Sequence, residues 1–327
     1  MREFLVVLAA ACAAGGCSRP LATARLSRLE PPAPEEIEAR EAIEHRSCTP
    51  NLAFLFPGAG QLCLGQTERG AVMGSVAAAE IGAAVGAAVE TRDADHPAVS
   101  LPTAALADLW VYGVFDMLHT RQLASAELYI PRDTPTDLVA APLNLQVMKR
   151  PGVWIGLGLA LAAGISVSLA TADDEDYDPD HAGDDPNLFG KHVKAAYGYP
   201  LGFAAGAGLF GHVALAEESV FRGYLQSALS RAWGENAGWV AASLIFGAAH
   251  IGNVLDADED DRNEYLLTAI PVITATGLYM GWLYRDSEYS LAPSVAMHFW
   301  YDLLLTSTFF VLDPENSLFS AGIAVPF

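Results

Sequence analysis

Basic residues are scarce in this sequence. It has 18 lysines and arginines against 39 aspartates and glutamates, which gives a formal net charge of −21. Nucleic-acid-binding proteins need basic patches to neutralise phosphates, and this chain has none. The composition therefore excludes a nucleic-acid partner.

Cysteine is also scarce, with four residues that all lie in the first fifth of the chain: Cys12, Cys17, Cys48 and Cys63. They form no C-x-x-C pair and have no neighbouring histidine pair, so their spacing indicates no metal site. The same spacing does not assign a disulfide. The His-Glu-x-x-His helix of zinc peptidases is absent as well.

Charge of either sign is limited to 17% of the residues, whereas 52% are hydrophobic. About 20 consecutive apolar residues are enough to cross a bilayer as a helix. The sequence therefore predicts an all-α, polytopic transmembrane bundle of about seven spans, near residues 71–89, 98–117, 153–172, 193–216, 237–254, 265–284 and 291–312. We expect Tyr224–Trp233 to form a separate interfacial helix, because Arg231 and Trp233 suit the headgroup region.

The N-terminal third divides into three segments. Residues 1–17 resemble a bacterial lipoprotein signal that ends at Cys17, and either cleavage with lipidation or an uncleaved anchor fits them. Residues 18–50 are predicted to be a polar linker. Residues 51–130 are predicted to form a membrane hairpin. It opens with a P-G-x-G-Q motif similar to that of several small bacterial membrane hairpin families, and this likeness implies packing rather than chemistry.

Lysines and arginines predict the orientation of the spans. With alternating spans, one side of the membrane receives Arg69, Arg121, Lys149-Arg150, Arg231 and Arg285. We expect this side to be cytoplasmic, in a bacterial inner membrane, with the acidic loops outside. Residues 18–66 would then lie inside, whereas a cleaved lipoprotein signal would place them outside, and the sequence leaves both alternatives open.

Several polar residues interrupt the spans without forming a motif. Glu80, Asp108 and Asp116 lie in the first two spans, and His212 lies in the fourth. Intramembrane carboxylates are candidates for function, but isolated ones also form hydrogen bonds between helices. We expect these four to be interhelical hydrogen bonders. The acidic loop at 173–180 lacks the EF-hand pattern and is expected to be solvated.

Three polar clusters lie on separate spans of the C-terminal half: Glu217-Glu218-x-x-x-Arg222, Phe246-x-x-x-His250 and His298-x-x-x-Asp302. Residues four apart share one face of a helix, so Arg222 can hold one glutamate ionised and Asp302 can accept the His298 ring N–H. A carboxylate and a histidine together can activate water, and further donors can stabilise an oxyanion. The alternative is that the glutamates are surface charges where a helix leaves the bilayer.

The three clusters resemble the motifs Glu-Glu-x-x-x-Arg, Phe-x-x-x-His and His-x-x-x-Asn/Asp of the CPBP family, the CAAX-protease and bacteriocin-processing (Abi) intramembrane glutamic endopeptidases. The likeness covers about residues 150–312, within a predicted protease domain at 131–327. It implies hydrolysis of a membrane-associated peptide or protein substrate in the lipid bilayer, with neither metal nor cofactor.

The resemblance also implies roles for single residues. Glu217 would be the general base, assisted by His250, and Glu218 and Arg222 would be structural or charge-setting partners. His298 and Asp302 would form the oxyanion side. Asp302 stands where better-studied CAAX proteases have asparagine, and orienting His298 is its alternative role, because a carboxyl group donates a hydrogen bond only when protonated.

Two other functions stay open at this point. One glutamate and two histidines can bind zinc, which makes a metal-dependent peptidase one alternative. A non-enzymatic membrane protein, such as an immunity or scaffold protein or a small transporter, is the other. The sequence shows no inverted repeats that would favour transport.

Overall fold

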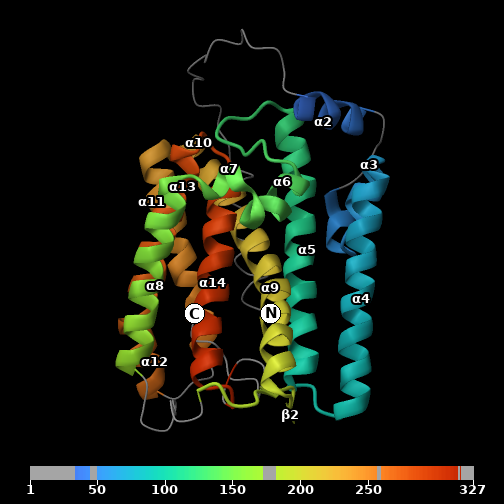
Figure 1. Cartoon of the computed structure of the whole chain (residues 1–327). Coiled ribbons are helices and arrows are strands. Elements are labelled where there is room, and N and C mark those ends of the chain that lie inside the picture. Colours follow the sequence, from blue (N-terminus) through green and yellow to red (C-terminus); the bar gives the residue numbers. More distant parts are fainter. Residues whose placement is uncertain (1–33, 45–49, 172–181, 256–258, 316, 318–327) are drawn as a thin grey trace.

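The fold is a bundle of long helices (Figure 1). The computed structural model describes residues 34–44, 50–171, 182–255, 259–315 and 317. The signal-like segment, most of the polar linker and the predicted acidic loop at 173–180 lie outside these residues. Cys63 is disulfide-bonded, and the other three cysteines also lie outside the described part of the chain.

In the described part of the chain, seven helices are long and apolar enough to cross a membrane, so the predicted all-α, seven-span architecture is confirmed. They are built on α4 (Thr67–Thr91), α5 (Pro97–Ala124), α8 (Pro151–Thr171), α9 (Ala195–Glu218), α11 (Glu235–Ala249), α13 (Ala269–Asp286) and α14 (Ala292–Leu312). The span of α11 continues through the 3-10 turn η5 (His250–Val254), and that of α13 includes α12 (Glu259–Leu267).

Short elements lie at the two ends of the bundle (Figure 1). One end carries α2 (Pro34–Glu44), α3 (Ala59–Leu64), α6 (Pro135–Ala140), η2 (Ala141–Leu143) and α7 (Leu145–Met148), whereas η1 (Pro50–Phe54) packs against the middle of α5, where Trp110 Nε1 donates to the Ala53 carbonyl at 3.1 Å. At the opposite end, β1 (Asn187–Leu188) and β2 (Lys191–His192) pair as a two-stranded antiparallel ribbon.

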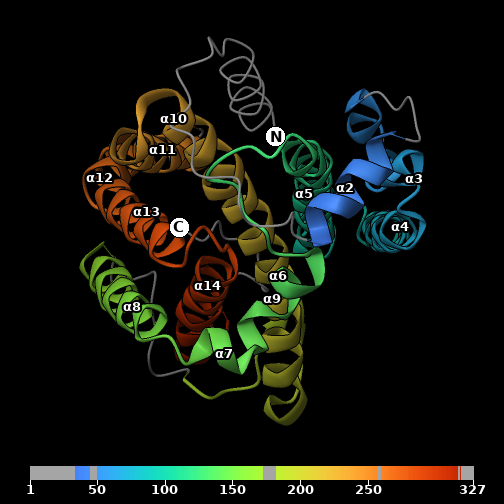
Figure 2. The same ribbon diagram turned by 90° about the horizontal axis from the view of Figure 1, so that it is seen from above.

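Helix α14 is the centre of the bundle. In its most apolar window 56% of the residues are buried inside the protein, against 11–33% for the other spans. Seen from above, it lies among α8, α9 and α13 (Figure 2). Side chains of α14 belong to both large apolar clusters, one shared with α8, α11 and α13 and the other with α5 and α9. A polar residue on α14 is therefore shielded from lipid by its neighbours.

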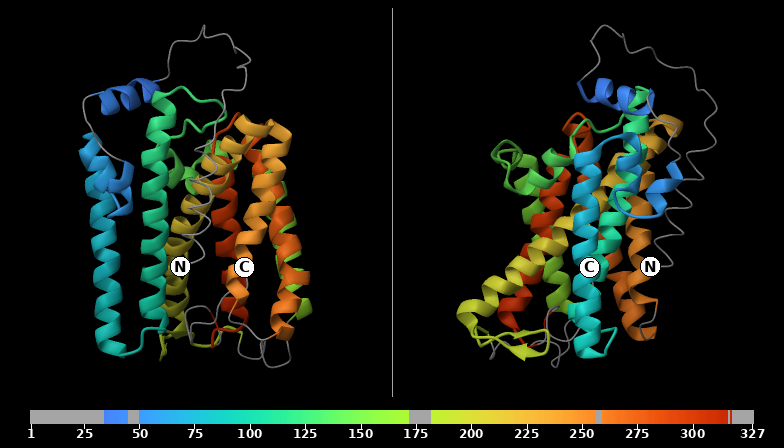
Figure 3. Two further views of the ribbon diagram at one scale, coloured as in Figure 1. Left: turned by 180° about the vertical axis from the view of Figure 1, so that it is seen from behind. Right: turned by 90° about the vertical axis from the view of Figure 1, so that its right-hand side faces the viewer.

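The hairpin α4–α5 stands at one side of the bundle, where α5 makes most of the contacts with the other spans (Figure 3). The P-G-x-G-Q motif at residues 57–61 precedes this hairpin and covers the turn between η1 and α3 and the start of α3. Gly58 has a φ of +88°, and a side chain there would overlap the Gly70 carbonyl oxygen. The fully buried Gln61 donates from Nε2 to the Gly113 carbonyl and to Asp116 Oδ2, both at 2.9 Å. The motif thus fixes α3 against α5.

The six basic residues that the prediction of orientation places on one side of the membrane lie at one end of the bundle. Helices α4 and α8 begin at this end, and α5 and α13 end there (Figure 1). It carries Arg69, Arg121, Lys149, Arg150, Arg231 and Arg285. That this end faces the cytoplasm stays a prediction.

The separate interfacial helix predicted at Tyr224–Trp233 is wrong. The chain passes without a break from α9 through a π-helical segment, η4 (Ser219–Gln226), into α10 (Ser227–Trp233). Together they form one continuous helical stretch of 39 residues, Ala195–Trp233. Gln226 is buried and donates from Nε2 to the Gly281 carbonyl of α13 at 3.0 Å. Contacts inside the bundle hold this segment in place, and its last residue, Trp233, is exposed.

Close packing of α11 on α10 depends on the absence of a side chain at Gly238. A methyl group there would overlap the backbone nitrogen of Ser230 and lie 2.6 Å from its Cα. Backbone atoms cannot rotate away. We therefore expect Gly238→Ala to cost about 1–3 kcal/mol of stability and to lower the melting temperature in detergent.

Gly208→Ala on α9 is the matched control, because a methyl group there meets nothing within 4 Å. Alanine also favours a helix over glycine. Its melting temperature should equal or slightly exceed that of the wild type. Equal melting temperatures for the two alanine variants would contradict the packing of α10 against α11.

Candidate active site

The two adjacent glutamates at the end of α9 point in different directions. Neighbouring residues of a helix are about 100° apart around its axis. Glu218 is fully buried among the helices, whereas the Glu217 side chain keeps 16% of its surface exposed and lines a cavity. The π-helical segment begins at the next residue, and such widened turns occur frequently at functional sites.

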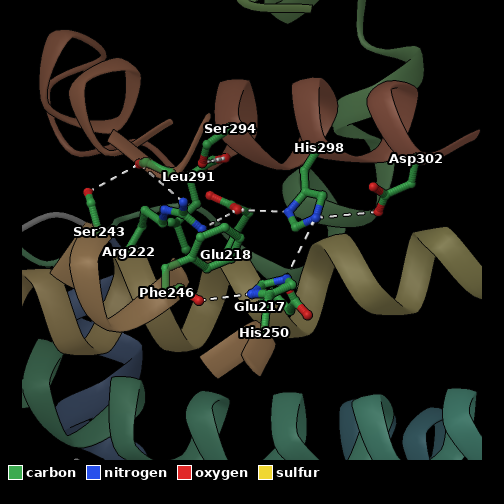
Figure 4. A network of polar contacts seen from close by, with 11 residues as sticks. Glu217, Glu218, Arg222, Ser243, Phe246, His250, Leu291, Ser294, His298 and Asp302 are labelled. Atoms are coloured by element: carbon green, nitrogen blue, oxygen red, sulfur yellow. Dashed lines mark hydrogen bonds and ion pairs between the residues drawn. The ribbon is translucent and has the colours of Figure 1, made fainter. Parts of the chain in front are cut away.

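Glu218 forms a fully buried ion pair with Arg222. Arg222 Nη1 lies 2.6 Å from Glu218 Oε1, and the two side chains are 2% and 0% exposed. Nη2 donates to the Gly277 carbonyl of α13 at 3.2 Å, and the guanidinium lies 4.1 Å from the centre of the Phe246 ring on α11 (Figure 4). A buried charge is tolerated only when it is paired and hydrogen-bonded. The pair therefore joins α9, η4, α11 and α13.

His298 on α14 is held by the same glutamate. Its Nδ1 lies 2.9 Å from Glu218 Oε1, and the ring is 5% exposed. Its Nε2 points toward two further carboxylates, with Asp302 Oδ2 at 3.4 Å and Glu217 Oε2 at 3.8 Å (Figure 4). The predicted contact of His298 with Asp302 is thus present.

His250 approaches Glu217 from the end of α11. Its Nδ1 lies 2.8 Å from the Phe246 carbonyl oxygen. Since a carbonyl only accepts, Nδ1 carries the hydrogen, and in the neutral ring Nε2 is an acceptor. This Nε2 lies 4.0 Å from Glu217 Oε2, which is too far for a hydrogen bond.

Two acceptors that face each other at this distance fit a bridging water. Glu217 Oε2 is buried and has no hydrogen-bond partner among the described residues. Water oxygens lie about 2.8 Å from their partners, so one molecule can donate to both Glu217 Oε2 and His250 Nε2. The arrangement can hold a water between a carboxylate and an imidazole.

The adjoining cavity has a volume of about 50 Å³. By the same measure a water needs roughly 10–15 Å³, so several fit. The walls come from α9, α11, α13 and α14: Val213, Glu217, Phe246, His250, Ile273, Thr276, Met280, His298, Tyr301 and Asp302. Sequence reasoning missed Val213, Ile273, Thr276 and Met280, since such residues in apolar spans carry no signal. Tyr301 could have been suspected from its place beside Asp302.

The other intramembrane polar residues lie apart from this cavity. Glu80 pairs with His212 across α4 and α9 at 3.1 Å. Asp116 pairs with Arg69 at 3.1 Å. These contacts agree with the prediction of interhelical hydrogen bonding. Asp108 does not line the cavity.

The described residues contain no group of three or more histidine, cysteine, aspartate or glutamate side chains arranged to hold a metal ion. The protein is thus a membrane-embedded helical bundle in which carboxylates, an arginine and two histidines gather around one small cavity. Glu217, Glu218, Arg222, His250, His298 and Asp302 all take part.

Comparison with protein-family models identifies the family to which this part of the chain belongs. Residues 200–304 match the family model described as Type II CAAX prenyl endopeptidase Rce1-like, so the chain carries a domain of that family there. The resemblance seen in the sequence is confirmed, and all six site residues lie within the matched range. Comparisons with curated proteins and with solved structures found no match.

The buried ion pair gives a stability test. Arg222→Met removes the partner of Glu218 and leaves a carboxylate buried without its strongest contact. Breaking such a pair typically costs about 3–5 kcal/mol. We expect a clear drop in the melting temperature measured by thermal unfolding in detergent.

The double variant Glu218→Gln/Arg222→Met is the control, because it removes both charges together. It should regain part of the lost stability. A single variant that melts like the wild type, or a double variant less stable than the single one, would show that the pair does not hold the helices together.

Proposed function

We propose that the protein is an intramembrane endopeptidase that hydrolyses peptide bonds of a membrane-associated peptide or protein, in a bacterial inner membrane. The observation that carries the proposal is the 4.0 Å separation of Glu217 Oε2 and His250 Nε2 at the wall of the cavity, which one water can bridge. The match of residues 200–304 to an endopeptidase family supports it.

In this mechanism Glu217 is the general base. The bridging water gives one proton to Glu217 Oε2 while its other hydrogen stays directed at His250 Nε2. Its oxygen then attacks the carbonyl carbon of the scissile bond. A base that is already desolvated and hydrogen-bonded to its water needs little rearrangement to act.

The oxyanion that forms would be stabilised from the opposite wall of the cavity. His298 Nε2 faces this space, 3.8 Å from Glu217 Oε2, and Asp302 lies beside it. A preorganised donor in a low-dielectric site stabilises developing charge more strongly than a donor in water. Glu218 and Arg222 stay outside the reaction and hold His298 in place.

The cavity also limits how a substrate binds. It lies within the bundle among α9, α11, α13 and α14, and a helix is about 10 Å across. A volume of about 50 Å³ cannot contain a helix. We infer that the substrate reaches Glu217 as a locally unwound segment.

Glu217→Gln tests the proposal, because an amide cannot accept the proton of water. General bases contribute about 10²–10⁴-fold to rate, and we expect a loss of this size. Purified protein in proteoliposomes would be incubated with a pool of synthetic transmembrane peptides, and the cleavage products would be measured by mass spectrometry.

Glu80→Gln is the matched control, since Glu80 is also an intramembrane glutamate beside a histidine, away from the cavity. It should cleave like the wild type. If Glu217→Gln cleaves as fast as the wild type, the endopeptidase proposal fails. A non-enzymatic role, as an immunity or scaffold protein or a transporter, would then be favoured.

The proposed mechanism uses no metal, and this can be tested separately. Preincubation with EDTA, followed by its removal, should leave the cleavage rate unchanged. Loss of activity that is restored by added zinc would instead support the metal-dependent alternative, with Glu217, His250 and His298 as ligands.

A further inference from the structure

Both ring nitrogens of His298 face carboxylates. Nδ1 lies 2.9 Å from Glu218 Oε1, and Nε2 lies 3.4 Å from Asp302 Oδ2 and 3.8 Å from Glu217 Oε2. A neutral imidazole has one N–H, so one nitrogen would direct its lone pair at a negatively charged oxygen. When the carboxylates on both sides are ionised, only the imidazolium, with a hydrogen on each nitrogen, satisfies both of them.

The surrounding charges divide into two groups. Glu218 is paired with Arg222 at 2.6 Å, so these two nearly cancel. Glu217 and Asp302 line the cavity, and among the described residues their direct ion-pair partners are histidines. The remaining titratable groups that face this space are His250 at the end of α11 and Tyr301 on α14 and, at longer range, Asp108 on α5 and Tyr265 on α12. Asp302 is thus the closest carboxylate to His298 Nε2.

We propose that His298 is the general acid of the reaction, giving its Nε2 proton to the leaving amide nitrogen, and that Asp302 keeps this imidazolium charged and directed into the cavity. Asp302 is then a positioning residue and not an oxyanion donor. This inference rests on the proposed function and extends it to the second half of the reaction.

Protons and bonds balance over the full catalytic cycle. In the attack, the water oxygen bonds to the carbonyl carbon, one water proton moves to Glu217, and the C=O electron pair moves to the oxygen. When the resulting tetrahedral intermediate collapses, the C=O bond re-forms, the C–N bond breaks, and the leaving nitrogen receives the His298 Nε2 proton. Glu217 then returns its proton to His298 across their 3.8 Å separation. Peptide and water become a carboxylic acid and an amine.

The pH dependence of kcat/KM distinguishes the two roles of Asp302. If His298 must be protonated, the alkaline limb reports the loss of its proton. Asp302→Asn removes a negative neighbour, so the imidazolium loses its proton at lower pH. An opposite charge within about 4–6 Å shifts a titration by one unit or more, and we expect the alkaline limb to move down by about one pH unit.

Glu80→Gln serves as the control again, because it removes an intramembrane carboxylate from a different histidine, His212. Its pH profile should match that of the wild type. An alkaline limb of Asp302→Asn that stays in place or moves to higher pH would overturn the proposal. A shift of the limb to higher pH would identify Asp302 as a protonated donor to the oxyanion.

A measurement that needs no catalysis decides the same point. In ¹⁵N-histidine-labelled protein in nanodiscs, the His298 signals can be assigned with the His298→Gln variant. We expect both ring nitrogens to be protonated at neutral pH in the wild type, and the second proton to be lost at lower pH in Asp302→Asn. A wild-type ring with one unprotonated nitrogen overturns the proposal.

The two measurements also separate this inference from the proposed function. A wild-type protein that cleaves no peptide at any pH refutes the endopeptidase proposal, whatever the state of the ring. The NMR titration still decides whether Asp302 controls the protonation of His298. Melting temperatures of Asp302→Asn and the wild type should agree before either comparison is made.

Discussion

The ion pair between Glu218 and Arg222 is the constraint on which the site depends. A membrane-embedded charge without a partner is costly, and this pair is withdrawn from lipid and water alike. Further contacts of the two side chains come from other helices: the Gly277 carbonyl of α13, the Phe246 ring of α11, and His298 and Ser294 of α14. Satisfying one buried charge pair therefore sets the relative positions of four spans.

The different surroundings of the two glutamate side chains follow from this constraint. Once Glu218 is committed to Arg222 and His298, the helical turn directs the adjacent Glu217 into the cavity. Glu218 is thus held in a buried ion pair, whereas Oε2 of Glu217 faces His250 at 4.0 Å. The two adjacent carboxylates have different surroundings and both contact the His298 ring.

Much of this arrangement could be predicted from the sequence, since it depends on local spacing. Apolar runs predicted the seven spans, and spacings of four predicted the contacts Glu218–Arg222 and His298–Asp302. What could not be predicted depends on hydrogen-bond register or on contacts between distant segments. The π-helical segment has no residue pattern of its own, so Tyr224–Trp233 was wrongly separated from α9. The Glu80–His212 pair and the Gln61–Asp116 hydrogen bond join separate helices. The roles of the six site residues stay predictions.

The most direct test of the central claim, that Glu217 makes this protein a peptidase, is a comparison of membrane peptides in cells. Membranes from cells that express the wild type or Glu217→Gln at equal levels would be compared by proteomics that identifies new peptide termini. The account predicts a set of termini within or beside membrane spans that appears with the wild type and is missing with Glu217→Gln. The same set of termini in both samples would contradict it.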